Sequence, residues 1–304
     1  MEDLKSIMVG LDLTEMDESV IRYMSMFTKH VKPESIYFVH VLKSNNLPPE
    51  LAADNDQPID ESLEMAMEKA VEKYAGKDAF SGTKVHYEGL EGSPMDQLLR
   101  FSKSKKVKLL AFGRKFKLKG GGIVPQQVAR KANASILFIP ERKVEGIKHI
   151  FIPLDFSKHT ELCANLGLEI AKKSGGKITF QHIYETPYGY HKTGKTREEM
   201  VQIMRGHAKK DFEEFIGKHD LGGVEVDAIY SLNDDRNIAR LIIEDAEKVK
   251  ADLVISGSKG RTNAAAMLMG SVAEGLVKWD NEIPLIIIKK PNEIMGFLDA
   301  LFKL

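Results

Sequence analysis

The chain contains the same pattern of residues twice. A strand-like run over residues 6–10 leads into Leu-Asp-Leu-Thr, and one over residues 149–153 leads into Leu-Asp-Phe-Ser, so Asp12 corresponds to Asp155 (155 − 12 = 143). Two later runs repeat in the same way and align His40 with His182 (182 − 40 = 142) and Gly113 with Gly257 (257 − 113 = 144). A repeat of this length is a whole domain, since domains are typically about 100–150 residues.

The last strand-like run follows at a different offset. Residues 135–140 correspond to residues 284–289, which is 149 positions (284 − 135 = 149) and five more than the preceding offset. The N-terminal half has therefore lost about five residues between its last two strands. The chain is one unit present in two copies that have since diverged at this point.

Short apolar runs alternate with helical patterns in both halves. This alternation is typical of βαβ units, whose parallel strands need helices on both faces of the sheet. We therefore predict an α/β protein with two tandem doubly wound, parallel, five-stranded sheets. The expected domains are residues 1–143 and 144–291, followed by a helical tail over 292–304 that packs on the body or on a partner chain. The predicted helices cover 19–30, 61–74, 94–104, 124–131, 160–173, 197–219, 237–249 and 272–279.

Composition excludes several classes of protein. Lys and Arg balance Asp and Glu at 44 each, which argues against a whole-protein electrostatic grip on nucleic acid. The one cysteine, Cys163, rules out an intrachain disulfide and a cysteine-built metal site. No apolar run reaches the roughly 20 residues that span a bilayer, and the acidic N-terminus does not resemble a signal peptide. These features predict a cytoplasmic protein without a membrane span.

A glycine-rich segment follows the fourth strand of the C-terminal half. It reads Gly257-Ser258-Lys259-Gly260 and continues, nine residues later, with Gly270-Ser271-Val272 at the start of a helix. Glycines let backbone N–H groups approach a polyanion, and the first N–H groups of a helix attract negative charge. The plainer alternative is that Gly257 only ends a strand and Gly270 only caps a helix. The segment is not a Walker loop, because no Gly-Lys-Ser/Thr follows at the required spacing.

The spacing Gly-x2-Gly-x9-Gly-Ser resembles that of the universal stress protein family, in its ATP-binding branch, and the whole chain looks like a tandem member. The resemblance implies a Rossmann-like fold of the adenine nucleotide alpha-hydrolase type, with ATP, ADP or AMP in the C-terminal half. Asp155 would contact ribose or adenine, the backbone of Ile183 would meet adenine, and Gly257 would lie against ribose. The phosphates would be surrounded by Ser258, Lys259, Gly260, Gly270, Ser271 and Val272. Mg²⁺ would bridge phosphate oxygens, because few carboxylates are available for a protein-built metal site.

The corresponding loop of the N-terminal half has changed. Asp12 is retained, but Phe116 stands where the second glycine belongs and the following stretch is too short. We therefore predict that this half does not bind ATP in the family's way. Its basic run, which includes Arg114 and Lys115 and continues with Lys117 and Lys119, is either solvated or a site for another anion.

No constellation of catalytic residues stands out, and no metal-ligand spacing is present. His40 and His182, at equivalent strand ends, are expected to be packed and hydrogen-bonded. We therefore predict a regulatory ATP-binding stress-response protein with slow or absent turnover. One alternative is a weak ATPase or autophosphorylating enzyme with Ser271 or Ser258 as acceptor. Another is a scaffold or ligand-binding module that uses the remodelled N-terminal half.

The resemblance also implies how the halves join. Domains of this family pair through their last strands, so residues 136–139 and 285–288 would pair within one chain. The chain would then be an internal pseudo-dimer, and two chains could associate further as a homodimer.

Overall fold

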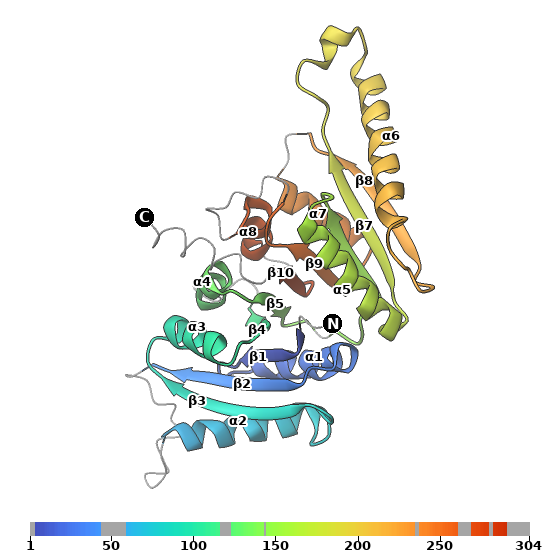
Figure 1. Ribbon diagram of the computed structural model, residues 1–304. Coiled ribbons are helices and arrows are strands. Elements are labelled where there is room, and N and C mark those ends of the chain that lie inside the picture. The colour runs from blue at the N-terminus through green and yellow to red at the C-terminus, as the bar shows by residue number, and fades with distance from the viewer. Residues whose placement is uncertain are drawn as a thin grey trace, which may run out of the picture. The chain divides into compact units, whose positions relative to one another are not determined.

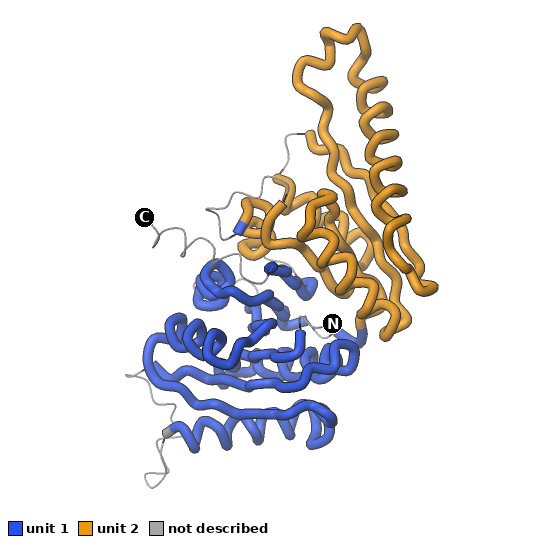
Figure 2. The backbone as a smooth tube through the Cα atoms, in the orientation of Figure 1, with its two compact units in different colours: residues 1–146, 264–269, 280–304 blue, residues 147–263, 270–279 orange. Residues whose placement is uncertain are grey.

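A computed structural model describes residues 4–43, 59–115, 123–142, 144–234, 237–260, 269–279 and 282–290. It divides into two compact units (Figure 2). Unit 1 comprises Met1–Gly146, Ala264–Met269 and Asp280–Leu304, and unit 2 comprises Ile147–Asn263 and Gly270–Trp279. The tail predicted over residues 292–304 lies outside the described residues.

Unit 1 holds the five strands of the N-terminal repeat in the order β3-β2-β1-β4-β5 (Figure 1). Each neighbouring pair in this order is parallel. The elements of the repeat are β1 (Ser6–Gly10), α1 (Met16–Val31), β2 (Ser35–Leu42), α2 (Ile59–Ala75), β3 (Lys84–Glu91), α3 (Pro94–Ser104), β4 (Leu109–Arg114), α4 (Ile123–Lys131) and β5 (Ser135–Pro140).

The strand order reverses between β1 and β4. The chain moves from β1 outward to β3 and then crosses to β4 and β5, so right-handed crossovers place α1 and α2 on one face and α3 and α4 on the other. The inner strands of the sheet carry most of its apolar core, and Ile7, Met8, Ile36, Leu109 and Ile136 are each fully buried. This is the predicted doubly wound, three-layer arrangement.

Unit 2 repeats the arrangement with parallel strands in the order β8-β7-β6-β9. Its elements are β6 (His149–Leu154), α5 (Lys158–Ser174), β7 (Lys177–Tyr184), a 3₁₀ turn η2 (Tyr190–Thr193), α6 (Arg197–Ile216), β8 (Val226–Leu232), α7 (Ile238–Lys248), β9 (Leu253–Gly257) and α8 (Ser271–Lys278). The strand order again reverses, between β6 and β9. The predicted tandem α/β architecture is therefore confirmed.

The last strand of the sequence, β10 (Leu285–Ile288), lies in unit 1 because it pairs antiparallel with β5. Leu285 lies opposite Phe138, and Ile287 lies opposite Ile136. All four residues of β10 and all six of β5 are buried. The predicted pairing between the last strands of the two repeats is confirmed.

A lysine fixes this pairing from one end. The Nζ atom of Lys289 donates hydrogen bonds to the carbonyl oxygens of Ala129, at 2.5 Å, and Ala132, at 2.7 Å. Both carbonyls lie at the C-terminal end of α4, where the helix leaves its carbonyls unpaired and its dipole is negative. The backbone N–H of Lys289 also donates to Ser135 Oγ at 3.1 Å. One residue thus joins the strand of the C-terminal repeat to the last helix of the N-terminal one.

Helix boundaries agree with the predicted ones to within a few residues. Helix α3 has the predicted bounds, because Pro94 fits the first turn of a helix and Ser104 precedes a lysine-rich turn. Helix α1 begins at Met16, three residues before the prediction. Within the described residues, no helix is both long and apolar enough to cross a membrane.

Candidate functional site

The predicted site residues of unit 2 meet where the strand order reverses. Asp155 directly follows β6, and Gly257 ends β9; the two strands are neighbours, with Ile150 paired to Leu253. The carboxyl ends of both strands point to the same edge of the sheet. This is the position at which open α/β sheets bind ligands.

The glycines of the loop are required by close contacts. A β-carbon at Gly260 would lie 2.7 Å from Oδ2 of Asp155, and one at Gly257 would lie 2.7 Å from Cβ of His159. Real β-carbons essentially never come this close to another heavy atom. The backbone N–H of Gly270 donates to the carbonyl of Ser258 at 2.8 Å, which joins the two ends of the glycine segment. The loop therefore runs directly over the carboxylate of Asp155.

Asp155 is held by the turn that follows it. Its Oδ1 accepts hydrogen bonds from the backbone N–H of Ser157, at 3.0 Å, and from the hydroxyl of Thr160, at 2.5 Å. Phe156, between them, adopts a left-handed conformation with φ of 60°. These bonds occupy Oδ1, so the Oδ2 atom is the one that faces Gly260.

The other side of the site is the start of α8. Gly270 is its N-cap, and the helix begins at Ser271, one residue before the predicted start. The N–H groups of this first turn have no partners within the helix and carry the positive end of its dipole. Ser271 is exposed, and Val272 and Lys259 are half-buried. Ser258 is 1% exposed, and its Oγ has no hydrogen-bond partner among the described residues.

A buried histidine lies at the strand end beside the loop. His182 Nδ1 lies 2.8 Å from the carbonyl of Leu154, and its ring lies against Phe156 with the centroids 4.7 Å apart. His182 is buried, so the prediction that it is packed and hydrogen-bonded is confirmed. Ile183, the next residue, is half-buried at the end of β7. Burial and the Asp155 charge raise the pKa of the Cys163 thiol, which keeps it protonated.

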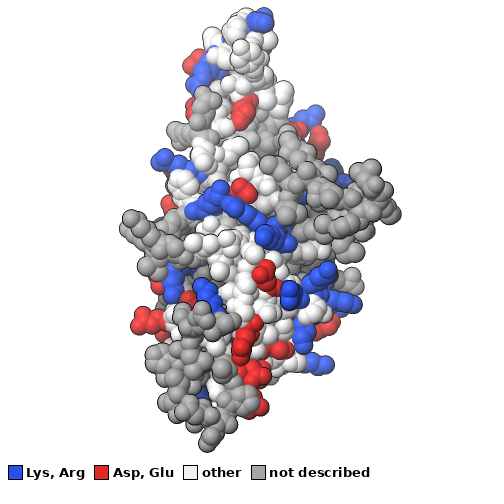
Figure 3. Space-filling view, turned by 90° about the vertical axis from the view of Figure 1, so that its left-hand side faces the viewer, with Lys and Arg blue, Asp and Glu red and all other residues white. Residues whose placement is uncertain are grey.

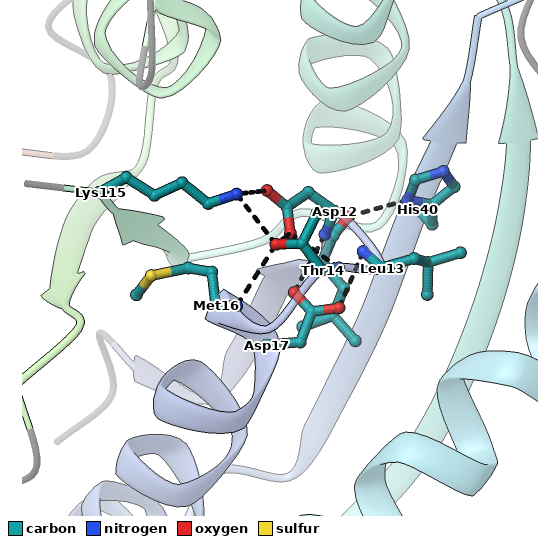
Figure 4. A network of polar contacts seen from close by, with 8 residues as sticks. Asp12, Leu13, Thr14, Met16, Asp17, His40 and Lys115 are labelled. Atoms are coloured by element: carbon teal, nitrogen blue, oxygen red, sulfur yellow. Dashed lines mark hydrogen bonds and ion pairs between the residues drawn. The ribbon is translucent and has the colours of Figure 1, made fainter. Parts of the chain in front are cut away.

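The N-terminal repeat builds the same turn with a different electrostatic arrangement (Figure 4). Nζ of Lys115 lies 3.2 Å from Oδ2 of Asp12 and donates to the hydroxyl of Thr14 at 3.0 Å. Lys115 thus contacts the oxygen of Asp12 that corresponds to the one faced by Gly260 in unit 2. His40 Nδ1 lies 3.0 Å from the carbonyl of Leu11, which matches the bond made by His182 and confirms the prediction for this histidine.

The structure shows where two residues of the basic run, Arg114 and Lys115, lie. Lys115 is paired with Asp12 and only 26% of its side chain is exposed, while the guanidinium of Arg114 lies 4.8 Å from the ring centroid of Phe138. Neither residue stands apart as a solvated charge. Phe116, Lys117 and Lys119 lie outside the described residues.

Two residues of the site escaped sequence reasoning. Thr160 and its counterpart Asp17 each lie five positions after the aspartate that follows the first strand of their repeat, and each contacts the turn that this aspartate begins. The shared offset of 143 residues (160 − 17 = 143) was the available signal. In the described part of the chain, no group of three or more His, Cys, Asp or Glu side chains is placed to hold a metal ion.

Comparisons with known proteins agree with this architecture. The sequence model of the universal stress protein family matches residues 4–140 and again residues 146–279. A universal stress protein of Methanocaldococcus jannaschii is 44% identical over 55 residues, which are 18% of this chain and 32% of that protein. The match therefore spans about a third of the length of that curated relative.

Solved structures resemble the whole chain. The crystal structure of a universal stress protein from Archaeoglobus fulgidus is 20% identical, covers 94% of this chain and 98% of its own, and has a TM-score of 0.64. A functionally unknown protein from Pseudomonas aeruginosa is 13% identical, with 99% and 98% coverage and a TM-score of 0.67. At these identities the likeness concerns the fold alone. With two matches of the family model over two copies of the doubly wound sheet, the chain belongs to the universal stress protein family as a tandem member.

Proposed function

We propose that the chain is a regulatory protein that binds an adenine nucleotide in its C-terminal repeat. The observation that carries the proposal is the close approach of Gly260 to Asp155. This approach requires a glycine at position 260, and a phosphate-binding loop requires a glycine at the same position. The unpaired N–H groups at the start of α8 and the buried hydroxyl of Ser258 are the donors that would receive phosphate oxygens.

Each predicted residue has a place in this arrangement. Asp155 would contact a ribose hydroxyl or an adenine edge, and the backbone of Ile183, at the neighbouring strand end, would meet adenine. Gly257 would lie against ribose, and the phosphate contacts would come from the rest of the loop and the helix start: Ser258, Lys259, Gly260, Gly270, Ser271 and Val272. A divalent cation such as Mg²⁺ would supply charge neutralisation between phosphate oxygens. It would take its remaining ligands from water, as Mg²⁺ usually does.

The N-terminal repeat is not expected to bind the nucleotide. Lys115 occupies Oδ2 of Asp12, so a ribose hydroxyl would have to displace an ion pair to reach it. We therefore expect one nucleotide per chain. Turnover is expected to be slow or absent, and the cytoplasmic location predicted from the sequence belongs to the same proposal.

Nucleotide content and stoichiometry test the proposal directly. The purified chain is denatured, and the released small molecules are identified by mass spectrometry against ATP, ADP and AMP standards. Calorimetric titration of the emptied protein with ATP and Mg²⁺ should give one site per chain. The proposal is wrong if no adenine nucleotide is found and no heat of binding is measured. Phosphate release in the same preparation would instead favour the weak ATPase.

A further inference from the structure

The two repeats build the same turn around different side chains. In each repeat the residue after the strand-ending aspartate is left-handed, with φ of 56° at Leu13 and 60° at Phe156. In each, a side chain from the first turn of the following helix reaches back to this turn. That side chain is the hydroxyl of Thr160 in the C-terminal repeat and the carboxyl of Asp17 in the N-terminal repeat.

Thr160 satisfies its turn without a charge. Its Oγ1 donates to Oδ1 of Asp155 at 2.5 Å and lies 3.5 Å from the backbone N–H of the same residue. A hydroxyl can donate and accept at once, so it supplies the aspartate with a donor and the backbone with an acceptor.

An ionised Asp17 cannot do both. Its oxygens accept the backbone N–H groups of Asp12, at 3.1 Å, and Leu13, at 2.9 Å, but an ionised carboxylate has no proton to donate. It then lies as a second negative charge beside the carboxylate of Asp12. Asp17 is only 3% exposed, so water screens this repulsion poorly. Protonation would give Asp17 a donor for Asp12 and reproduce the part played by Thr160.

The charged groups around Asp12 and Asp17 do not neutralise both carboxyl groups. Lys115 approaches from the end of β4 and contacts Asp12, while the neutral or charged ring of His40 approaches from the end of β2 and contacts the carbonyl of Leu11. Among the described residues, the oxygens of Asp17 receive only the two backbone N–H groups of the turn and the neighbouring Asp12 carboxyl. Further ionisable residues near this end of α1 include Glu15, just before the helix, and Glu18, whose carboxylate pairs with Arg22 at 2.8 Å, and Glu141 follows β5.

We propose that Asp17 binds a proton beside the carboxylate of Asp12 in the N-terminal repeat, and that the gain or loss of this proton changes how firmly Lys115 is held. With the proton on Asp17, the charges of Asp12 and Lys115 balance and the cluster of Asp12, Asp17 and Lys115 is neutral. Without it, the cluster carries a net negative charge and the ammonium of Lys115 is attracted more strongly. The N-terminal repeat would then respond to pH, independently of nucleotide in the C-terminal one.

The direction of the effect on stability follows from the same contacts. Burial, as the largest cause, and the charge of Asp12 raise the pKa of Asp17 to about 7, against about 4 in an unfolded chain. The folded state therefore binds the proton more tightly than the unfolded state. The stabilisation is complete below about pH 4, declines as the pH rises toward 7, and is lost above it.

Carboxyl ¹³C NMR tests the proposal on the full chain. The Cγ resonance of Asp17, assigned by its disappearance in Asp17→Asn, should titrate with a midpoint between about pH 6 and 8. Asp12→Asn removes the neighbouring charge and should move this midpoint downward by a measurable amount. Asp17 ionised throughout, with a midpoint below about pH 5, would overturn the proposal.

The C-terminal repeat supplies the matched variant. Asp17→Thr places a threonine in this turn, as Thr160 stands at the equivalent position of the C-terminal repeat. The variant should keep the turn and should no longer titrate at position 17. Between about pH 5 and 8 the wild-type chain should lose stability relative to Asp17→Thr, as read from denaturation midpoints. Parallel curves for the two proteins would contradict the proposal. If Asp17→Thr does not fold, the NMR titrations of the wild type and Asp12→Asn decide the matter alone.

Discussion

The carboxylate of Asp155 and the α-carbon of Gly260 are so close that a single added methyl group would lie 2.7 Å from Oδ2 of the aspartate. Asp155 cannot easily move away, because its other oxygen is bonded to Ser157 and Thr160. The contact connects the end of β6 to the loop after β9. The ends of β6 and β9, on either side of the point where the strand order reverses, are thus joined by a close contact that requires glycine at position 260.

Gly260→Ala should therefore weaken ATP binding while leaving the fold intact. The added methyl group displaces the carboxylate or the loop, and we expect a loss of about 10-fold or more in affinity, or at least 1.4 kcal/mol. Isothermal titration with ATP and Mg²⁺ measures it. Gly206→Ala is the control, because a β-carbon there meets open space on α6. Unchanged affinity in Gly260→Ala would show that the contact between Gly260 and Asp155 does not contribute to ATP binding.

Equivalent lysines distinguish the two repeats. Lys259 corresponds to Lys115 (259 − 115 = 144), but only Lys259 belongs to the proposed site. Lys259→Met should weaken nucleotide binding by about 5- to 30-fold, roughly 1–2 kcal/mol for one charge-assisted contact. Lys115→Met breaks the ion pair with Asp12 and should leave the affinity unchanged. The opposite pattern would place the nucleotide in the N-terminal repeat.

Lys289→Met should destabilise the folded chain. The substitution keeps most of the apolar stem but removes the donor from the carbonyls of Ala129 and Ala132, which stay buried at the end of α4. The expected loss is about 1–3 kcal/mol in the free energy of unfolding. Urea denaturation followed by circular dichroism measures it. Lys290→Met, at an exposed neighbouring position, should have an effect within about 0.5 kcal/mol.

The buried carboxylate of Asp245 in unit 2 should make stability depend on pH in the direction opposite to that expected for Asp17. Asp245 is 6% exposed and accepts hydrogen bonds from Gln181 at 2.7 Å and Ser231 at 2.6 Å, while Lys248 pairs with its other oxygen at 2.7 Å. Burial, the largest single effect, acts to raise the pKa of Asp245, but the hydrogen bonds from Lys248, Ser231 and Gln181 together lower it below its usual value. Its contribution to stability is therefore present above the unfolded pKa of about 4 and is lost as the pH falls through the lower folded value.

Asp245→Asn should accordingly cost about 1–3 kcal/mol at pH 7. The difference between the variant and the wild type should shrink once the pH falls below about 4. Denaturant midpoints measured over this range give the comparison. A deficit that stays constant with pH would show that the lost packing of the side chain, and not its charge, accounts for the effect.

The fold was predictable because its signals are local or repeated. Apolar runs and helical spacing identified each strand and helix, and the duplication checked one half against the other. The 3₁₀ turn at Tyr190–Thr193 was missed, because two left-handed glycines, Gly189 and Gly194, bracket it and leave no periodic pattern. The early start of α1 was missed because Asp17 reaches backward, to Asp12 and Leu13.

The contacts between side chains far apart in the sequence were harder to predict. Lys115 was recognised only as part of a basic run, since its pairing with Asp12 joins residues about a hundred positions apart. Lys289 gave no signal at all, because the carbonyls it meets belong to the other copy of the repeat. Such contacts depend on which strand ends the topology brings together. The nucleotide roles of the glycine segment remain predictions that its geometry accommodates.

The pairing of β10 with β5 has a consequence for how the chain is made. The edge of β5 is completed by residues 285–288, which are synthesised 145 residues after β5 ends (285 − 140 = 145). While the ribosome is still translating the C-terminal repeat, the largely apolar β5 therefore lacks the strand that covers its edge in the folded chain. Nascent chains are then open to pairing with one another at this edge until β10 has been made.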